Sequence, residues 1–126
     1  MKVTIIIPFY NEVARINLEN FYQIFKEFPH YNFLLVDDGS SDNTIAVLEE
    51  FKSKFSAIQV LKLPKNVGKA EAIRSAVLSL SDTDFISYYD ADLATPFSEL
   101  DMLIQFSIKN PNYKMVMGAR IKLIGN

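Results

Sequence analysis

The sequence predicts an α/β fold: one domain in which helices cover both faces of a mostly parallel β-sheet, giving three layers. Short apolar runs rich in β-branched and aromatic residues alternate with segments whose apolar residues recur every three to four positions. Such alternation produces parallel strands joined by right-handed crossovers. A length of 126 residues with 49% hydrophobic residues suits a single domain with a substantial core.

Five apolar runs are the candidate strands. The first is almost continuously apolar, as expected for a strand buried on both faces of a parallel sheet. The later runs are shorter and each is bounded by polar or turn residues. The five runs are residues 3–9, 32–36, 58–63, 85–89 and 113–117.

Four intervening segments have the apolar spacing of amphipathic helices. The fourth begins at Pro96, a favoured residue in a first helical turn, and Asn110-Pro111 ends it. The periodic apolar residues are Ile16, Phe21, Ile24, Phe25 and Phe28, then Ile45, Leu48, Phe51 and Phe55, then Ile73, Ala76, Val77 and Leu80, then Leu100, Leu103, Ile104 and Ile108.

Composition excludes several classes of function. A formal net charge of -2 argues against nucleic acid as a partner, because phosphate-backbone binding normally needs an excess of Lys and Arg. The absence of Cys excludes disulfides, thiolate zinc sites and cysteine nucleophiles, and the single His30 cannot build a multi-histidine metal site. No segment approaches the roughly 18 uninterrupted apolar residues of a membrane span.

Polar motifs follow the candidate strands, at the sheet edge where α/β folds bind ligands. The first strand is followed by Pro8, Tyr10 and Glu12, which could place a ring and a carboxylate against a nucleobase; a simple turn or helix start at Asn11 or Glu12 is the alternative. The second is followed by Asp37-Asp38-Gly39-Ser40-Ser41-Asp42. Helix capping explains Ser41 or Asp42 but not the paired acids, which suggest a polar ligand or a cation.

The third and fourth strands are followed by a basic and an acidic motif. Lys69 in Asn66-Val67-Gly68-Lys69 could neutralise phosphate, although the motif lacks Walker spacing and could simply start a helix. Asp90-Ala91-Asp92 can direct two carboxylates at one hard cation, Mg²⁺ or Mn²⁺. Capping of the next helix by Asp92 or Thr95 would leave Asp90 unexplained.

A fifth motif, Gly118-Ala119-Arg120, adds a guanidinium suited to phosphate, although a lone Arg is more often a solvated surface residue. Five polar motifs at five successive strand ends would meet at one edge of the sheet. Together they predict a site for a metal and a diphosphate.

In their order along the chain, these motifs resemble those of family-2 glycosyltransferases with the GT-A fold. The resemblance covers essentially all 126 residues and rests on Ile5-Ile6-Ile7-Pro8-Phe9-Tyr10-Asn11-Glu12, Val36-Asp37-Asp38-Gly39-Ser40-Ser41-Asp42, Asn66-Val67-Gly68-Lys69 and Asp90-Ala91-Asp92. It implies an inverting transfer of a hexose from a nucleotide-diphosphate sugar, with metal and positive charge stabilising the leaving group.

The resemblance also assigns roles to residues of this chain. Asp90 and Asp92 are the implied catalytic and metal-binding residues, with Asp92 the direct ligand of Mg²⁺ or Mn²⁺. The implied donor-binding residues are Pro8, Tyr10 and Glu12 around the base and ribose, Val36 and Asp38 at the base, Asp90, Ala91 and Asp92 at the ribose and diphosphate, and Lys69 and Arg120 at the phosphates.

Within the family, Asp90-Ala91-Asp92-Leu93-Ala94-Thr95-Pro96 is similar to the motif of dolichyl-phosphate and polyprenyl-phosphate β-glucosyltransferases. Mannosyl-transferring relatives commonly have Gln at the position of Ala94, so the resemblance favours UDP-glucose as donor and a polyprenyl phosphate at a membrane surface as acceptor. It implies that residues 1–126 are the donor-binding part of a catalytic domain truncated at its C-terminus. We expect a cytoplasmic protein, peripheral to the membrane through C-terminal residues beyond this chain.

Two other classes of function fit parts of the sequence. A signalling receiver domain has a similar length and an acidic pair, but that pair follows the first strand, whereas Asp37-Asp38 follows the second. A nucleotide-sugar-binding module without turnover would share the fold. Intact Asp90 and Asp92 favour the enzyme over this module.

Overall fold

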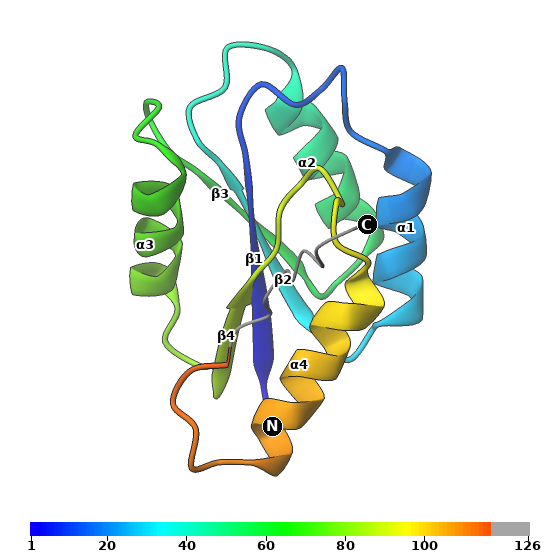
Figure 1. The fold of residues 1–126 in the computed structure, drawn as a ribbon. Coiled ribbons are helices and arrows are strands. Elements are labelled where there is room, and N and C mark those ends of the chain that lie inside the picture. Colours follow the sequence, from blue (N-terminus) through cyan, green and yellow to red (C-terminus); the bar gives the residue numbers. More distant parts are fainter. Residues whose placement is uncertain (117–126) are drawn as a thin grey trace, which may run out of the picture. The chain divides into compact units, whose positions relative to one another are not determined.

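Four parallel strands form one sheet, in the order β3-β2-β1-β4, in the computed structural model, which describes residues 1–116 (Figure 1). The chain divides into two units, residues 1–94 and residues from 95 onward, and the sheet belongs to the first. The elements are β1 (Val3–Phe9), α1 (Leu18–Glu27), β2 (Asn32–Asp37), α2 (Thr44–Lys54), β3 (Ile58–Lys62), α3 (Lys69–Ser79), β4 (Phe85–Tyr88) and α4 (Phe97–Lys109).

Strand β1 is central and pairs with β2 on one side and β4 on the other. Ile5 lies opposite Phe33 of β2 and opposite Ser87 of β4. Six of the seven residues of β1 are buried, which explains its nearly continuous apolar sequence. The register brings the carboxyl ends of all four strands to the same edge of the sheet.

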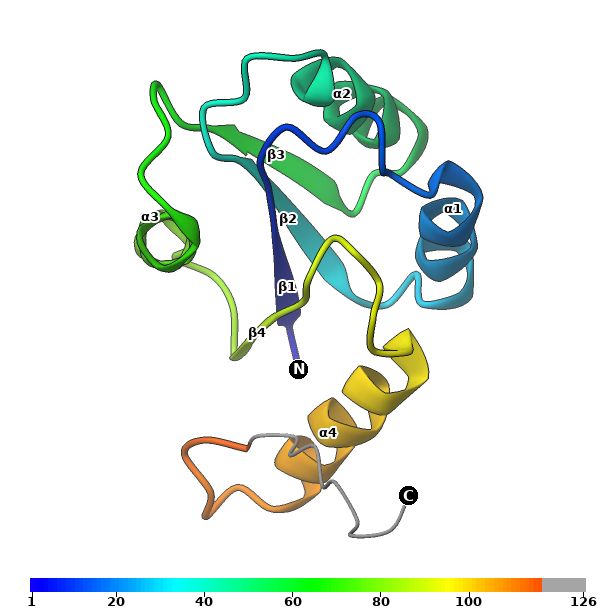
Figure 2. The same cartoon turned by 45° about the horizontal axis from the view of Figure 1, so that its top comes forward.

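Helices α1 and α2 cover one face of the sheet, and α3 covers the other (Figure 2). Phe residues fill the first interface: the ring of Phe21 lies 5.7 Å from those of Phe9 and Phe51, and Phe25 meets Phe33 edge-on at 4.9 Å between ring centroids. Edge-on and tilted contacts of this kind are the favoured geometry of aromatic pairs. The aromatic-rich composition therefore serves the packing of α1 and α2.

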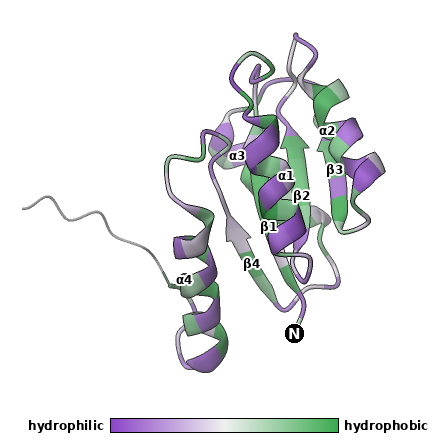
Figure 3. Ribbon diagram, turned by 90° about the vertical axis from the view of Figure 1, so that its right-hand side faces the viewer, coloured by the Kyte–Doolittle hydropathy of each residue, from purple (hydrophilic) through white to green (hydrophobic). Residues whose placement is uncertain are grey.

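The α3 face is packed differently. Ala72 and Ala76 are fully buried against a cluster that includes Ile6, Leu34 and Val36. Two small residues one turn apart allow α3 to approach the sheet closely, which brings the start of this helix near the strand ends. Figure 3 shows hydrophobic and hydrophilic residues alternating along the helices, as expected for helices with one buried face.

The predicted α/β fold and its first four strands are confirmed, each within one residue at either end. Ile16 was wrongly placed in a helix: it lies between the turn at residues 13–15 and α1, because the side chain of Asn17 accepts a hydrogen bond from Asn20 N and starts α1 at Leu18. The predicted fifth strand is absent from residues 113–116, where Tyr113 N instead closes a turn on Asn110 O. Residues 117–126, including Gly118, Ala119 and Arg120, lie outside the described residues.

The second unit contains α4, which follows Pro96 as predicted. Its last turn is closed by Asn110 N, which donates to Phe106 O at 3.0 Å. Within residues 1–116, no helix has both the length and the apolar character needed to cross a membrane.

Candidate functional site

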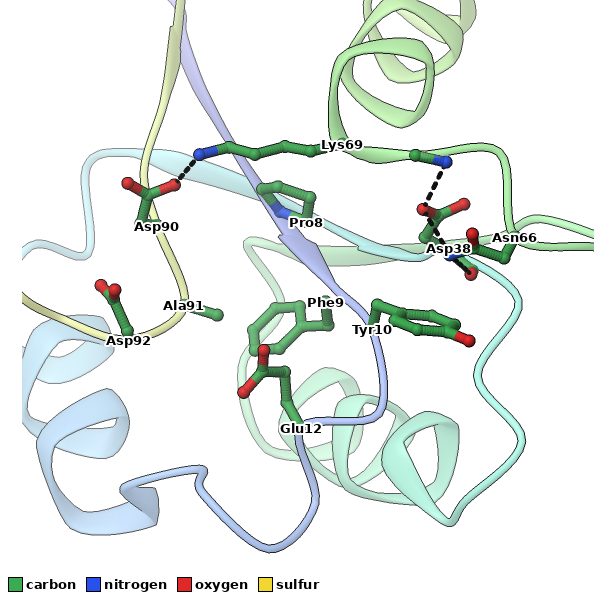
Figure 4. A pocket seen from close by; sticks show the side chains of 11 residues that line it. Pro8, Phe9, Tyr10, Glu12, Asp38, Asn66, Lys69, Asp90, Ala91 and Asp92 are labelled. Carbon is green, nitrogen blue, oxygen red and sulfur yellow. Dashed lines mark hydrogen bonds and ion pairs between the residues drawn. The ribbon is translucent and has the colours of Figure 1, made fainter.

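A pocket of about 420 Å³ lies at the carboxyl ends of the strands, within the first unit (Figure 4). Its volume is typical of small-molecule sites. Residues at the ends of three strands, in the loops that follow them and at the start of α3 line it: Pro8 and Phe9 at the end of β1, Tyr10 and Glu12 after β1, Asp38 after β2, Asn66 and Gly68 before α3, Lys69 at its start, and Asp90, Ala91 and Asp92 after β4.

The carboxylate of Asp38 fixes one end of this pocket. It accepts hydrogen bonds from Val67 N at 2.8 Å, from Gly68 N at 3.0 Å and from Asn66 Nδ2 at 3.0 Å. Asp38 is only 3% exposed. We call residues 10–12, Asp38 and residues 66–68 the clamped end of the pocket, because a buried carboxylate ties the loop before α3 to β2.

Close backbone approach completes this clamp. Gly39 has φ +67°, and a Cβ there would lie 2.3 Å from the carbonyl carbon of Lys65 and 2.4 Å from Asn66 N. Only glycine fits, since real side chains do not approach backbone atoms that closely. The glycine that the sequence placed after Asp37-Asp38 therefore lets the two loops touch.

The β1–α1 loop is held by the β2–α2 loop. Asn11, at φ 48°, donates its backbone N–H to Ser40 Oγ at 2.9 Å, and its Oδ1 accepts from Ser41 N at 2.8 Å. Glu12 N donates to Thr44 Oγ1 at 3.0 Å. These bonds fix the backbone on both sides of Asn11, so Tyr10 and Glu12 are presented to the pocket by a rigid turn.

Asp37 and Asp42 accept hydrogen bonds from residues that hold the β1–α1 loop. Asp42 accepts from the backbone and hydroxyl of Thr44, and the hydroxyl bond is the main cause that lowers the pKa of Asp42. Asp37 is fully buried, and its Oδ1 accepts from Ser40 N at 3.2 Å. Its Oδ2 has no hydrogen-bond partner among the described residues.

The other end of the pocket carries the charges. Lys69 Nζ forms an ion pair with Asp90 and lies 5.4 Å from the ring centroid of Tyr88. The hydrogen bond to Asp90 is the main cause that raises the pKa of Lys69. Asp92 Oδ1 accepts from Ala94 N at 3.0 Å. We call Asp90, Ala91, Asp92 and the Lys69 ammonium group the open end, since the side chains of both Lys69 and Asp90 are about half exposed.

The carboxylates of the open end fit a hard divalent cation. Asp90 and Asp92 carry carboxylate oxygens on one short loop (Figure 4), and residues 1–116 contain no group of three or more His, Cys, Asp or Glu that could enclose a metal. A site with few protein ligands suits Mg²⁺ or Mn²⁺, which usually retain waters and bind substrate phosphates. The donor set therefore fits a cation that is bound together with a phosphate-bearing ligand.

Most of the predicted site residues meet in this pocket. Pro8, Tyr10, Glu12, Asp38, Lys69, Asp90, Ala91 and Asp92 all line it. Val36 does not: its side chain is buried against α3. Arg120 lies outside the described residues. The alternative helix-cap roles are not observed for Asn11 or Asp92, because α1 is capped by Asn17 and α4 has no side-chain cap.

Sequence reasoning missed how the motifs hold one another. It did not list Phe9, Asn66 or Gly68 as site residues, nor predict that Asp38 binds the 66–68 loop or that Lys69 pairs with Asp90. A signal was available for the first of these contacts: the two loops follow consecutive strands, and consecutive strands usually lie side by side. Nothing in the sequence marked Lys69 as the partner of Asp90.

Comparison with known proteins identifies the class. Residues 4–126 match the family Glycosyl transferase family 2. A dolichyl-phosphate beta-glucosyltransferase (ALG5C) of Trichomonas vaginalis is 33% identical over 97% of this chain and 39% of its own length. An undecaprenyl-phosphate 4-deoxy-4-formamido-L-arabinose transferase of Proteus mirabilis is 35% identical over 82% of this chain and 32% of its own length.

Solved structures agree on the fold. Mannosyltransferase PcManGT of Pyrobaculum calidifontis, in complex with GDP-Man and Mn²⁺, matches 75% of this chain and 33% of its own with a TM-score of 0.60 and 24% identity. Glucosyl-3-phosphoglycerate synthase of Mycobacterium tuberculosis, with Mn²⁺, UDP and glucosyl-3-phosphoglycerate, matches 86% of this chain and 40% of its own with a TM-score of 0.63 and 20% identity.

The fold is that of the GT-A glycosyltransferases. More particularly, the chain belongs to glycosyltransferase family 2. It spans about two fifths or less of the length of the curated relatives described above. The family assignment removes the signalling receiver domain as an alternative.

Proposed function

We propose that this chain is the donor-binding part of an enzyme that transfers a hexose, with inversion, from a nucleotide-diphosphate sugar to a polyprenyl phosphate. One observation carries the proposal: a single pocket joins a rigid, buried polar clamp to an exposed pair of carboxylates beside a lysine. A nucleoside diphosphate has the complementary form, with a base and ribose at one end and a diphosphate at the other.

The clamped end would take the nucleoside. Tyr10 is 44% exposed and offers a ring for the base, while Glu12 lines the same side of the pocket with a carboxylate. The carboxylate of Asp38 receives three hydrogen bonds, which leaves about one of its roughly four lone-pair sites for an N–H of the base. A carboxylate held this firmly can read a base edge without first being ordered.

The open end would take the diphosphate. Lys69 brings a positive charge, and it stands at the N-terminus of α3, where backbone N–H groups and the helix dipole also favour anions. Asp90 and Asp92 would hold Mg²⁺ or Mn²⁺. A divalent cation bound there offsets negative charge on the departing nucleoside diphosphate.

The reaction we infer is a direct displacement at the anomeric carbon. The acceptor oxygen forms the new bond on the face opposite the leaving phosphate, so the configuration inverts. A polyprenyl phosphate is already an oxyanion at neutral pH and needs positioning more than a general base. Lys69 stabilises the leaving diphosphate, and the rigid Tyr10–Glu12 turn keeps the nucleoside in place.

The choice of donor and acceptor rests on the relatives. Both curated relatives are named for a polyprenyl-phosphate acceptor, but they transfer different sugars, so the acceptor class is better supported than the sugar. UDP-glucose is our proposed donor, because the relative at 33% identity is a glucosyltransferase and Ala94 lacks the amide common in mannosyl-transferring members. One fold neighbour binds GDP-Man and another UDP, so the fold accommodates either nucleotide.

Calorimetric titration of residues 1–126 with UDP and with GDP, each in Mn²⁺ and in chelator, tests the proposal. We expect UDP to bind in Mn²⁺, to bind at least about tenfold more weakly in chelator, and to be preferred over GDP. Preference for GDP would overturn the glucosyl-type donor. Binding of neither nucleotide would contradict the assignment of this pocket.

A nonenzymatic nucleotide-sugar-binding module is the second candidate, and it would bind UDP in the same way. The two are separated by incubating a longer form of the protein, extended to the length of the curated relatives, with UDP-glucose and a short-chain polyprenyl phosphate. Formation of a glucosyl lipid supports the enzyme. Tight binding without product, for every nucleotide sugar that binds, supports the module.

A further inference from the structure

Lys69 forms an ion pair with Asp90, one of the two carboxylates that the proposed function assigns to the divalent cation. Its Nζ pairs with Asp90, and the ring of Tyr88 lies 5.4 Å from the same ammonium group. Figure 4 shows the side chain extended from the start of α3, above Pro8, to Asp90. In this state the positive charge lies at the place that the cation would need.

The backbone of Lys69 is fixed, whereas its charged group is exposed to solvent. The preceding residues, Val67 and Gly68, donate to the buried carboxylate of Asp38 at 2.8 and 3.0 Å, which sets where α3 begins. The side chain of Lys69 is 53% exposed and has a flexible four-carbon stem. It can therefore change partners without any movement of the helix.

The ion pair itself is easily exchanged. Asp90 is 52% exposed, and ion pairs this exposed hold their partners only weakly, because water screens the charges. A divalent cation that binds without a nucleotide would nevertheless have to displace the ammonium group of Lys69 from Asp90, and the two positive charges would then repel each other at close range. When the cation binds together with a diphosphate, the diphosphate becomes the new anionic partner of Lys69. Displacement of Lys69 from Asp90 then carries no electrostatic penalty.

We propose, resting on the function proposed above, that Lys69 is a resident cation of the open end: it holds Asp90 while the pocket is empty and transfers to the diphosphate when nucleotide and metal bind. Lys69 thereby makes binding of the divalent cation conditional on the nucleotide. The pair keeps Asp90 neutralised in the free chain and weakens the binding of Mg²⁺ or Mn²⁺ in the absence of a substrate.

The chain contains a matched control for this lysine. Lys54 Nζ on α2 pairs with Glu50 at 3.0 Å and lies 4.9 Å from the ring centroid of Tyr22 on α1, whose hydroxyl also accepts a hydrogen bond from it. Lys54→Met and Lys69→Met therefore both remove one positive charge, an ion pair and a ring contact, and Lys54→Met also removes the hydrogen bond to the Tyr22 hydroxyl. Only Lys69 lines the pocket.

The test measures Mn²⁺ binding to the free chain by the loss of the electron paramagnetic resonance signal of free Mn²⁺, with and without UDP. For Lys69→Met we expect Mn²⁺ alone to bind about fivefold more tightly than to the unsubstituted chain, as expected from removal of an exposed ion pair. We expect UDP in saturating Mn²⁺ to bind about tenfold more weakly, because the diphosphate loses a charged partner. Lys54→Met should change neither affinity.

A second substitution locates the effect at Asp90. In an Asp90→Asn background there is no carboxylate for Lys69 to hold, so adding Lys69→Met should no longer tighten Mn²⁺ binding. Circular dichroism and urea denaturation of each variant check that the fold is retained. A gain that persists in the Asp90→Asn background would mean that Lys69 acts through general charge and would overturn the inference.

The outcomes separate this inference from the proposed function. If the unsubstituted chain binds UDP with Mn²⁺ but Lys69→Met binds Mn²⁺ alone no more tightly, then Lys69 is not a resident cation and the donor site stands. If the unsubstituted chain binds no nucleotide, then the proposed function fails. Weaker binding of both Mn²⁺ and UDP by Lys69→Met would indicate a structural role and would also overturn the inference.

Discussion

The two ends of the pocket are built in opposite ways. At the clamped end, the 3%-exposed carboxylate of Asp38 receives three hydrogen bonds, and the 0%-exposed Asp37 supports the adjoining loop. At the open end, Asp90 and Lys69 are about half exposed and mainly neutralise each other. Under the proposed function, rigidity is supplied where the nucleoside would be recognised, and exchangeable charge where the diphosphate and the cation would bind together.

The contrast predicts that substitutions at the clamped end cost stability, whereas substitutions at the open end cost binding. The largest expected effect is that of Gly39→Ala, since the added Cβ meets the backbone of Lys65 and Asn66 and the φ of +67° is itself unfavourable for alanine. We expect a loss of about 4 kcal/mol in the free energy of unfolding, from overpacking together with backbone strain. Urea denaturation of the purified chain measures it.

Gly68→Ala is the matched control for that substitution. Gly68 also has a positive φ, +92°, but a Cβ there has nothing within 4 Å. Only the conformational penalty remains, and because φ 92° and ψ 157° lie in a region that essentially only glycine adopts, we expect a loss of about 2 kcal/mol. Equal losses for the two substitutions would show that the close contact at Gly39 is relieved by a small shift, and that the clamp is looser than the structure indicates.

The next largest effect is expected for Asp38→Asn. The amide keeps the shape of the side chain but replaces one of the two carboxylate oxygens by an NH₂ group. This group cannot accept a hydrogen bond, so either Val67 N or Gly68 N loses its partner at a buried site. We expect a loss of about 3 kcal/mol in the free energy of unfolding and weaker binding of UDP. Glu49→Gln removes one carboxylate charge from an exposed position of α2 and should change neither quantity.

At the open end the expectation reverses. Asp92 is exposed and its Oδ1 receives a single hydrogen bond, from Ala94 N, so Asp92→Ala should change the free energy of unfolding by no more than about 0.5 kcal/mol. We expect the Mn²⁺-dependent part of UDP binding to be lost, as measured by titration in Mn²⁺ and in chelator. Unchanged Mn²⁺ dependence would show that the cation does not use Asp92.

The sequence predicted the open end and the fold better than it predicted the clamp. Apolar runs locate buried strands because the burial of a strand is encoded in its own residues. The two carboxylates of Asp90-Ala91-Asp92 likewise indicate a cation site by residue type alone. The Asp38 clamp depends on which loops are neighbours, and the only signal for that was the consecutive order of the two strands, which does not specify the hydrogen bonds. The sequence also did not predict that the side chain of Val36 packs against α3.

Two other features show where local pattern is insufficient. Residues 113–116 have the apolar character of a strand but make no strand in the structure, because a strand exists only where a partner supplies its backbone hydrogen bonds. The Lys69–Asp90 pair joins side chains 21 positions apart through their neighbouring places at the strand ends. Both depend on long-range pairing rather than on residue type.

The smallest expected effect concerns pH and the support beneath the clamped end. The hydrogen bond from the Thr44 hydroxyl lowers the pKa of Asp42, so the folded state favours the charged form. The stabilisation is therefore present above the ordinary pKa of an aspartate and is lost as the pH falls through the lowered value in the folded chain. Because Thr44 Oγ1 also accepts from Glu12 N at 3.0 Å, protonation of Asp42 should loosen the turn that carries Tyr10. We expect the acid limb of a stability–pH profile to be slightly shallower in Asp42→Asn than in the unsubstituted chain. Identical acid limbs would show that this carboxylate does not support the clamped end, and that the bonds of Asn11 to Ser40 and Ser41 and of Glu12 N to Thr44 hold the Tyr10–Glu12 turn without it.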